Sequence, residues 1–154
     1  MIKIGIIAGG GKLPLLIGES LQSKNYPVSF FCIKNLFILS DYSNQDVTEI
    51  DITSFSKILV ALKSKNIKKI IMAGNVSRPS LKEIKFDLST LSLIKDYFLE
   101  SSGDDKLLQT ISFFFNKNGY PLFDWKKICS DLFSQDTHLT INIPTKKAYK
   151  NLHK

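Results

Sequence analysis

Short apolar runs alternate with segments of helical periodicity through the first half of the chain. The apolar runs predict strands, and the segments whose apolar residues recur every three or four positions predict helices. The expected strands cover residues 2–8, 28–33, 47–52 and 69–73, and the expected helices cover 13–24 and 54–66. Such an alternation is typical of an α/β domain. We therefore predict a Rossmann-like parallel sheet with flanking helices.

The first strand has a pattern that also predicts its place in the sheet. Residues 2–8 are apolar at both odd and even positions, apart from Lys3 and Gly5. Strands that helices cover on both faces have this continuous pattern. We expect this strand to lie inside the sheet and not at an edge.

The second half of the chain has a more helical pattern. Helices are expected at residues 88–100, 104–118 and 126–133, with short extended pieces at 123–125 and 139–143. The 154 residues, of which 44% are hydrophobic, suit one domain with a sizeable core. Because the last residues are polar and basic, we expect residues 1–144 to form the domain and 145–154 to form a basic tail.

Three consecutive glycines, Gly9–Gly11, follow the first strand directly, and Lys12, Leu13 and Pro14 then begin a predicted helix. A strand, a glycine turn and a helix N-terminus together form a socket for anions. Glycines let the backbone approach a phosphate, and the helix start offers unpaired N–H groups. The pattern indicates a phosphorylated or nucleotide ligand. A tight turn without any ligand is the alternative.

Two common nucleotide motifs do not fit this turn. The dinucleotide fingerprint needs a third glycine where the chain has Pro14, and a Walker A loop needs Ser or Thr where it has Leu13. A nicotinamide site would also need a carboxylate after the second strand, but Ile33 is followed by Lys34 and Asn35. A different Rossmann-like oxidoreductase is therefore a less favoured alternative.

The formal net charge of +7 favours anionic partners. The aromatic residues lie mostly in apolar stripes, such as 30–31 and 113–115, so we expect no nucleic-acid partner. No apolar run approaches the roughly 20 residues of a membrane helix, and no signal-peptide pattern is present. Cys32 and Cys129 both lie in apolar surroundings, which suits a reducing compartment. We expect a cytoplasmic protein, and peripheral contact with the inner membrane stays open.

Three segments in order, residues 7–14 (IAGGGKLP), 72–79 (MAGNVSRP) and 103–108 (GDDKLL), carry a family resemblance, with 139–144 as a weaker fourth. Together they resemble the N-terminal domain of the LpxI-type UDP-2,3-diacylglucosamine pyrophosphatases of lipid A biosynthesis. The resemblance implies a metal-dependent hydrolysis, with Mg²⁺ or another divalent ion, that releases UMP and the acylated sugar phosphate lipid X. It covers nearly the whole chain.

The resemblance also implies a second domain, which carries the family's catalytic aspartate and begins past the position of Pro144. We expect that domain to be absent here, and we assign no catalytic residue. The chain is then the substrate-binding half of the enzyme, which binds UDP-diacylglucosamine or lipid X, and a separately encoded C-terminal domain is an expected partner. A non-catalytic module that binds a nucleotide sugar or a phosphate is the alternative. A domain of a longer protein, a split gene and a remnant stay open as origins.

The resemblance and the residues suggest the same substrate-binding positions. They are Gly9, Gly10, Gly11, Lys12 and Leu13 at the first strand end, Asn75, Val76 and Arg78 at another, and Asp104 and Asp105 at a helix start. Arginine is a natural bidentate partner of phosphate.

The acidic pair has two interpretations. It caps its helix, or it binds ribose or sugar hydroxyls or a magnesium ion through water. His138 and His153 lack partners at ligand spacing, so the sequence indicates no zinc site.

Overall fold

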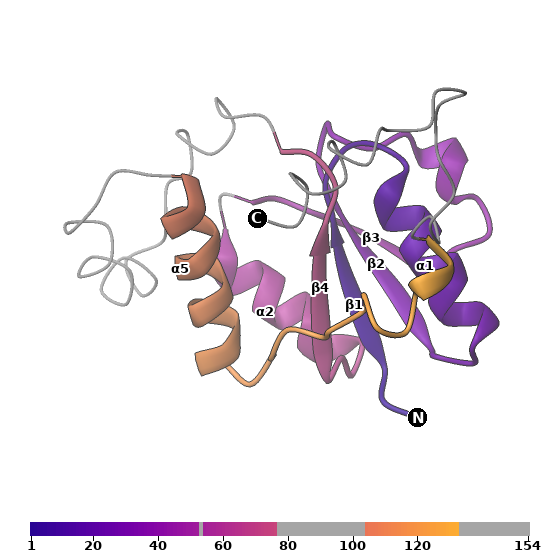
Figure 1. Ribbon diagram of the computed structural model, residues 1–154. Helices are drawn as coiled ribbons and strands as arrows, with labels where there is room; N and C mark the ends of the chain where they lie inside the picture. Colours follow the sequence, from indigo (N-terminus) through magenta and orange to yellow (C-terminus); the bar gives the residue numbers. More distant parts are fainter. Residues whose placement is uncertain (53, 77–103, 133–154) are drawn as a thin grey trace, which may run out of the picture.

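A computed structural model describes residues 1–52, 54–76 and 104–132, with only the backbone for 104–107. Its centre is a four-stranded parallel sheet in the order β3-β2-β1-β4 (Figure 1). The strands are β1 (Ile4–Ala8), β2 (Val28–Ile33), β3 (Val47–Ile50) and β4 (Lys69–Ala73). The α/β prediction is confirmed, and β1 lies between β2 and β4 as its pattern predicts.

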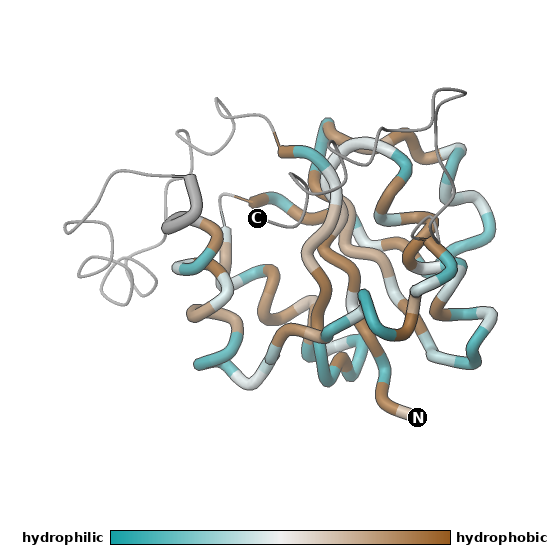
Figure 2. The backbone as a smooth tube through the Cα atoms, in the orientation of Figure 1, coloured by the Kyte–Doolittle hydropathy of each residue, from teal (hydrophilic) through white to brown (hydrophobic). Residues whose placement is uncertain are grey.

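Helices cover both faces of this sheet. One face carries α1 (Leu13–Ser23), and the other carries α2 (Phe55–Ser64) and α5 (Asp104–Lys117), as Figure 1 shows. Side chains alternate between the faces along each strand, so the sheet separates two apolar cores. Ile6 and Phe30 pack under α1, whereas Ile7 and Phe31 pack under α2 and α5. In Figure 2 the hydrophobic colours follow the strands. No helix of the described part of the chain is long and apolar enough to cross a membrane.

The segment after α5 extends the sheet in an unexpected way. Leu122 forms a parallel bridge with Ile70, because Ile70 donates to Pro121 O (3.1 Å) and Phe123 donates to Ile70 O (2.8 Å). The extended piece expected at 123–125 therefore pairs slightly earlier, at 121–123. It covers the free edge of β4.

The helix predicted at 126–133 is wrong. That region forms a turn and the short 3₁₀ helix η2 (Ser130–Leu132). The apolar side chains of Ile128 and Leu132 pack against the α1 core in this conformation. The carboxylate of Asp131 accepts bonds from Ser20 Oγ (2.7 Å) and Lys24 Nζ of α1, so tertiary contacts hold this segment. A second 3₁₀ helix, η1 (Leu39–Tyr42), lies between β2 and β3. The elements expected at 88–100 and 139–143 and the tail 145–154 lie outside the described residues.

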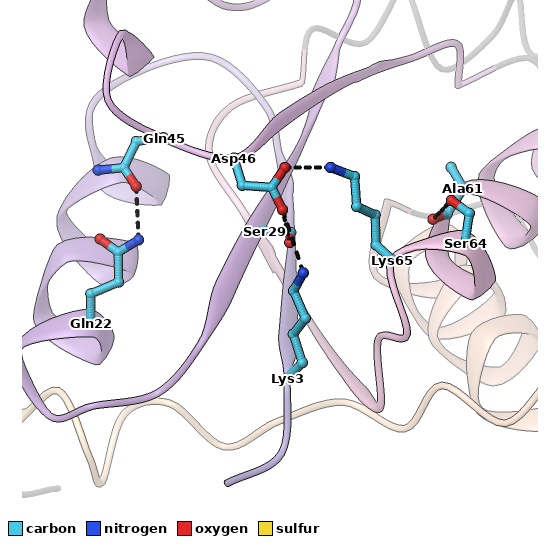
Figure 3. A network of polar contacts seen from close by, with 8 residues as sticks. All are labelled: Lys3, Gln22, Ser29, Gln45, Asp46, Ala61, Ser64 and Lys65. Carbon is cyan, nitrogen blue, oxygen red and sulfur yellow. Dashed lines mark hydrogen bonds and ion pairs between the residues drawn. The ribbon is translucent and has the colours of Figure 1, made fainter.

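One carboxylate joins four segments at the amino edge of the sheet (Figure 3). Asp46 accepts a bond from the buried Ser29 Oγ (2.6 Å), and it pairs with Lys65 and with Lys3 (3.4 Å). Burial opposes its charge, but the bonds from Lys65 and Ser29 and the nearby lysine charges hold the pKa of Asp46 below its usual range. This network fixes the amino edge, away from the strand ends that the sequence marks as a site.

Candidate functional site

The carboxyl ends of β1 and β4 lie side by side, at the point where the chain changes faces of the sheet. β1 leads into α1 on one face, whereas β4 follows α2 on the other. In open parallel sheets, ligands bind at such a switch point. Both glycine turns of the sequence, 9–11 and 74, are located here.

Three backbone hydrogen bonds close the gap between these strand ends. Gly9 donates to Ala73 O (2.8 Å), and Gly10 and Asn75 exchange bonds of 2.7 and 2.8 Å. A Cβ atom on Gly9 would lie 2.6 Å from Asn75 O, closer than real Cβ atoms come. Gly9 is thus required by the packing of two strand ends. The N–H groups of Gly9 and Gly10 are bonded to the protein and are not directed at a ligand.

The open part of the predicted anion socket is the next three residues. A Cβ on Gly11, where φ is +88°, would meet nothing within 4 Å. Among the described residues, the N–H groups of Gly11, Lys12 and Leu13 have no acceptor. These groups stand at the N-terminus of α1, whose dipole favours an anion, and Pro14 follows in the first turn. This arrangement can hold a phosphate.

Of the other predicted positions, the structure describes Asn75 and Val76 fully and Asp104 and Asp105 by their backbone alone. Asn75 is exposed beside the glycine turn, and Val76 is half-buried next to it, with its Cγ2 3.1 Å from the Cβ position of Gly9. Arg78 lies outside the described residues. Asp104 and Asp105 begin α5, which starts at the level where the strands end (Figure 1), but their side chains are outside the described part. The structure thus brings Asn75 and Val76 to the glycine turn.

A cavity of about 510 Å³ lies at this edge, between the sheet and the pair α2 and α5. Its floor is the carboxyl half of the strands, with Ile7, Ile33 and Met72, and its sides come from the two helices. The described lining residues are Ile7, Gly9, Ile33, Ile50, Ile52, Phe55, Ile58, Met72, Ala73, Gly74, Asn75, Val76, Leu108, Ile111 and Phe115. None of them is charged, so the cavity suits an apolar group.

The cavity is a feature that the sequence analysis missed. Phe115 lies in an apolar stripe of the sequence and is buried, but it also forms part of a cavity wall. An apolar cavity and a filled core have the same apolar periodicity in one dimension. The alternation of side chains along each strand is the one sequence signal for this cavity, because it assigns Ile7, Ile33 and Met72 to the same face of the sheet.

Buried titratable groups near the site lie on the opposite face, under α1. Burial raises the pKa of the Cys32 thiol to about 11. Burial, followed by the charges of Cys32 and Asp41, raises the pKa of Tyr42 to about 12. Both groups stay protonated at neutral pH, so neither provides a nucleophile.

The described side chains do not by themselves provide a metal site. Within that set, no three His, Cys, Asp or Glu residues gather where they could hold a metal ion. A magnesium ion would therefore need ligands beyond the described side chains, such as the acidic pair at the start of α5 or groups from another domain.

Comparisons with known proteins agree on one family. Residues 3–132 match the family described as the LpxI N-terminal domain. The chain is also similar to the UDP-2,3-diacylglucosamine pyrophosphatase LpxI of Caulobacter vibrioides, with 30% identity over 125 residues. That similarity covers 79% of this chain but 44% of the relative, so the chain spans less than half of the relative's length.

Proposed function

Because the chain belongs to the family of LpxI N-terminal domains, we propose that it is the substrate-binding half of a UDP-2,3-diacylglucosamine pyrophosphatase. The observation that carries the proposal is the set of N–H groups at the start of α1 that have no acceptor within the described part of the chain, located at the switch point of the sheet. A diphosphate is an anion that such a helix start binds. The whole enzyme would release UMP and lipid X in lipid A biosynthesis.

We propose separate roles for the residues at this edge. The N–H groups of Gly11, Lys12 and Leu13 would bind one phosphate, and the ammonium of Lys12 would add charge complementarity. Asn75 would hydrogen-bond the sugar or the phosphate from the other side of the glycine turn. Arg78 would be a bidentate phosphate ligand. Gly9 and Gly10 would shape the turn without donating to the ligand, since their N–H groups are already bonded.

We also propose that hydrolysis depends on a divalent metal, such as Mg²⁺, and on groups beyond the described residues. A bound metal would polarise the diphosphate and lower the pKa of the attacking water. Asp104 and Asp105 would contribute through water, and the C-terminal domain of the family would supply the catalytic carboxylate. We propose a cytoplasmic location with peripheral contact with the inner membrane, which co-sedimentation with anionic vesicles would test.

Two glycines allow a matched test of the anion site. Gly11 and Gly119 have nearly the same φ, +88° and +86°, and a Cβ at either would meet nothing within 4 Å. Replacing either with Ala therefore costs a similar backbone strain, about 1–2 kcal/mol. Only Gly11 lies at the proposed site. We expect the affinity for UDP, measured by calorimetric titration, to fall at least tenfold in Gly11→Ala and to stay unchanged in Gly119→Ala.

The comparison has a clear contrary outcome. Equal UDP affinities in the wild-type protein and Gly11→Ala would show that the turn does not contact the ligand. Thermal unfolding of both variants would establish that they are folded to the same extent. No UDP binding by the wild-type protein would contradict the site itself.

A further inference from the structure

The exposure of the residues around the 510 Å³ cavity defines which end is open. Asn75 and Gly74 are exposed, and Leu108 is 54% exposed. Phe55 and Phe115 are almost fully buried, and their rings are in contact, with centroids 5.9 Å apart. The mouth therefore lies at the carboxyl edge of the sheet, and the inner end lies at the aromatic pair between α2 and α5.

The chemistry of the lining excludes most parts of a nucleotide sugar from this cavity. Apart from Asn75 at the mouth, the side chains of the described residues that line it are aliphatic, aromatic or thioether groups. A uracil base or a sugar placed inside would lose hydrogen bonds to water without replacement, which costs several kcal/mol. Pockets of roughly 300–1,000 Å³ are large enough for small ligands. A hydrocarbon group is the ligand part that matches this lining.

The mouth is also close to the proposed phosphate site. Gly9 lines the cavity, and two residues later Gly11 carries the first N–H group without an acceptor in residues 1–52, 54–76 and 104–132. Two residues of chain span at most about 7 Å. A ligand with a phosphate at one end and a hydrocarbon at the other can therefore reach both sites together.

From this geometry we propose that the cavity binds one saturated acyl or alkyl chain of a phosphorylated ligand. The chain enters past Leu108 and Asn75, and its end approaches Phe55 and Phe115. This inference rests on the proposed function, because it requires the phosphate at the start of α1. It adds the residues that would bind one chain of a diacylated substrate and limit its length.

A series of n-alkyl phosphates, used below their micelle concentrations, tests the proposal. Burial of each methylene is worth about 0.8 kcal/mol, or about fourfold in affinity. We expect the affinity to rise about fourfold per added methylene and to level off once the cavity is full. Replacing Met72 with Phe would reduce the volume, so the affinity should level off at a shorter chain.

A matched pair of helix variants separates the cavity from general surface effects. Leu108 and Val60 are exposed apolar residues of α5 and α2, 54% and 69% exposed, and only Leu108 lines the cavity. Leu108→Asp should lower the affinity for dodecyl phosphate at least tenfold, whereas Val60→Asp should not change it. Because both side chains are exposed, both variants should fold, which circular dichroism would verify.

Two results would overturn the inference: an affinity independent of chain length, or equal losses in Leu108→Asp and Val60→Asp. A parallel titration with UDP separates this failure from a failure of the proposed function. If UDP binds and the affinity for alkyl phosphates does not depend on their chain length, the phosphate site is supported and the cavity is rejected as an acyl-chain site. Failure of UDP and of every alkyl phosphate to bind would reject both.

Discussion

At the scale of single residues, Asp46 joins three distant parts of the chain, and no motif in the sequence predicts these contacts. Its carboxylate contacts Lys3 before β1, Ser29 in β2 and Lys65 after α2. The buried Ser29 hydroxyl depends on this acceptor. Because the side chains of Asp46 and its lysines are 31–38% exposed, solvent screening limits the stabilisation to about 1 kcal/mol.

The lowered pKa of Asp46 makes this contribution depend on pH. A carboxylate with a depressed folded-state pKa stabilises the protein above its unfolded pKa, about 3.9, and loses the effect as the pH falls through the folded value. Asp46→Asn should therefore unfold about 1 kcal/mol more easily at pH 7, and the difference from wild type should shrink as the pH falls below about 3.9 and through the lowered folded-state pKa of Asp46. Urea denaturation across this range measures it. Asp124→Asn, which removes a more exposed pair with Lys127, is the control and should change stability little.

At the scale of elements, the packing of α1 on the sheet depends on a missing side chain. A Cβ on Gly18 would lie 2.1 Å from Cζ of the Phe30 ring, which is fully buried in β2. Gly18→Ala should thus destabilise the protein by about 1–3 kcal/mol, although alanine favours the helix by up to about 1 kcal/mol. The ring must move before the helix can stay in place.

A double-mutant cycle tests this explanation. Phe30→Leu removes the atoms that Gly18→Ala would meet, so the two changes together should cost less than the sum of their separate costs. Denaturation midpoints of the wild type, both single variants and the double variant provide the comparison. Additive losses would mean that Gly18 matters for some reason other than its contact with Phe30.

Elements with continuous apolar runs could be predicted from the sequence because burial on both faces leaves that pattern. β2 and β4 have the predicted bounds, and β1 begins only two residues later than expected. The helix expected at 126–133 could not be excluded in this way. A single turn that packs on α1 has the same apolar spacing as a helix, and the Asp131 contacts with α1 are long-range.

The candidate site was also only partly predictable from the sequence. The sequence located both glycine turns, but it could not distinguish a glycine required by a neighbouring strand end from one approached by a ligand. Both requirements select against a Cβ atom. The structure separates them, since Gly9 abuts Asn75 O and Gly11 faces open space. The proposed chain site escaped prediction because the side chains around an apolar cavity look like those of a core.

At the scale of the whole molecule, the described residues include the proposed binding groups but not a full set of the groups needed for hydrolysis. Diphosphate hydrolysis needs metal, a positioned water and charge stabilisation around the reacting phosphorus. The described residues offer N–H donors and Lys12, but no group of three metal-ligating side chains. We therefore expect binding and catalysis to be separable in this chain.

The final prediction concerns that separation. The purified chain, with UDP-2,3-diacylglucosamine in detergent micelles and Mg²⁺ or Mn²⁺, should release no UMP at an enzymatic rate. Turnover should appear when a C-terminal domain of the family is added, because we propose that this domain supplies the catalytic carboxylate. Robust turnover by the chain alone that disappears in Asp104→Asn or Asp105→Asn would contradict this division and place the catalytic groups at the start of α5. Lys106→Gln, a charge change one residue further along α5, is the matched control for either variant.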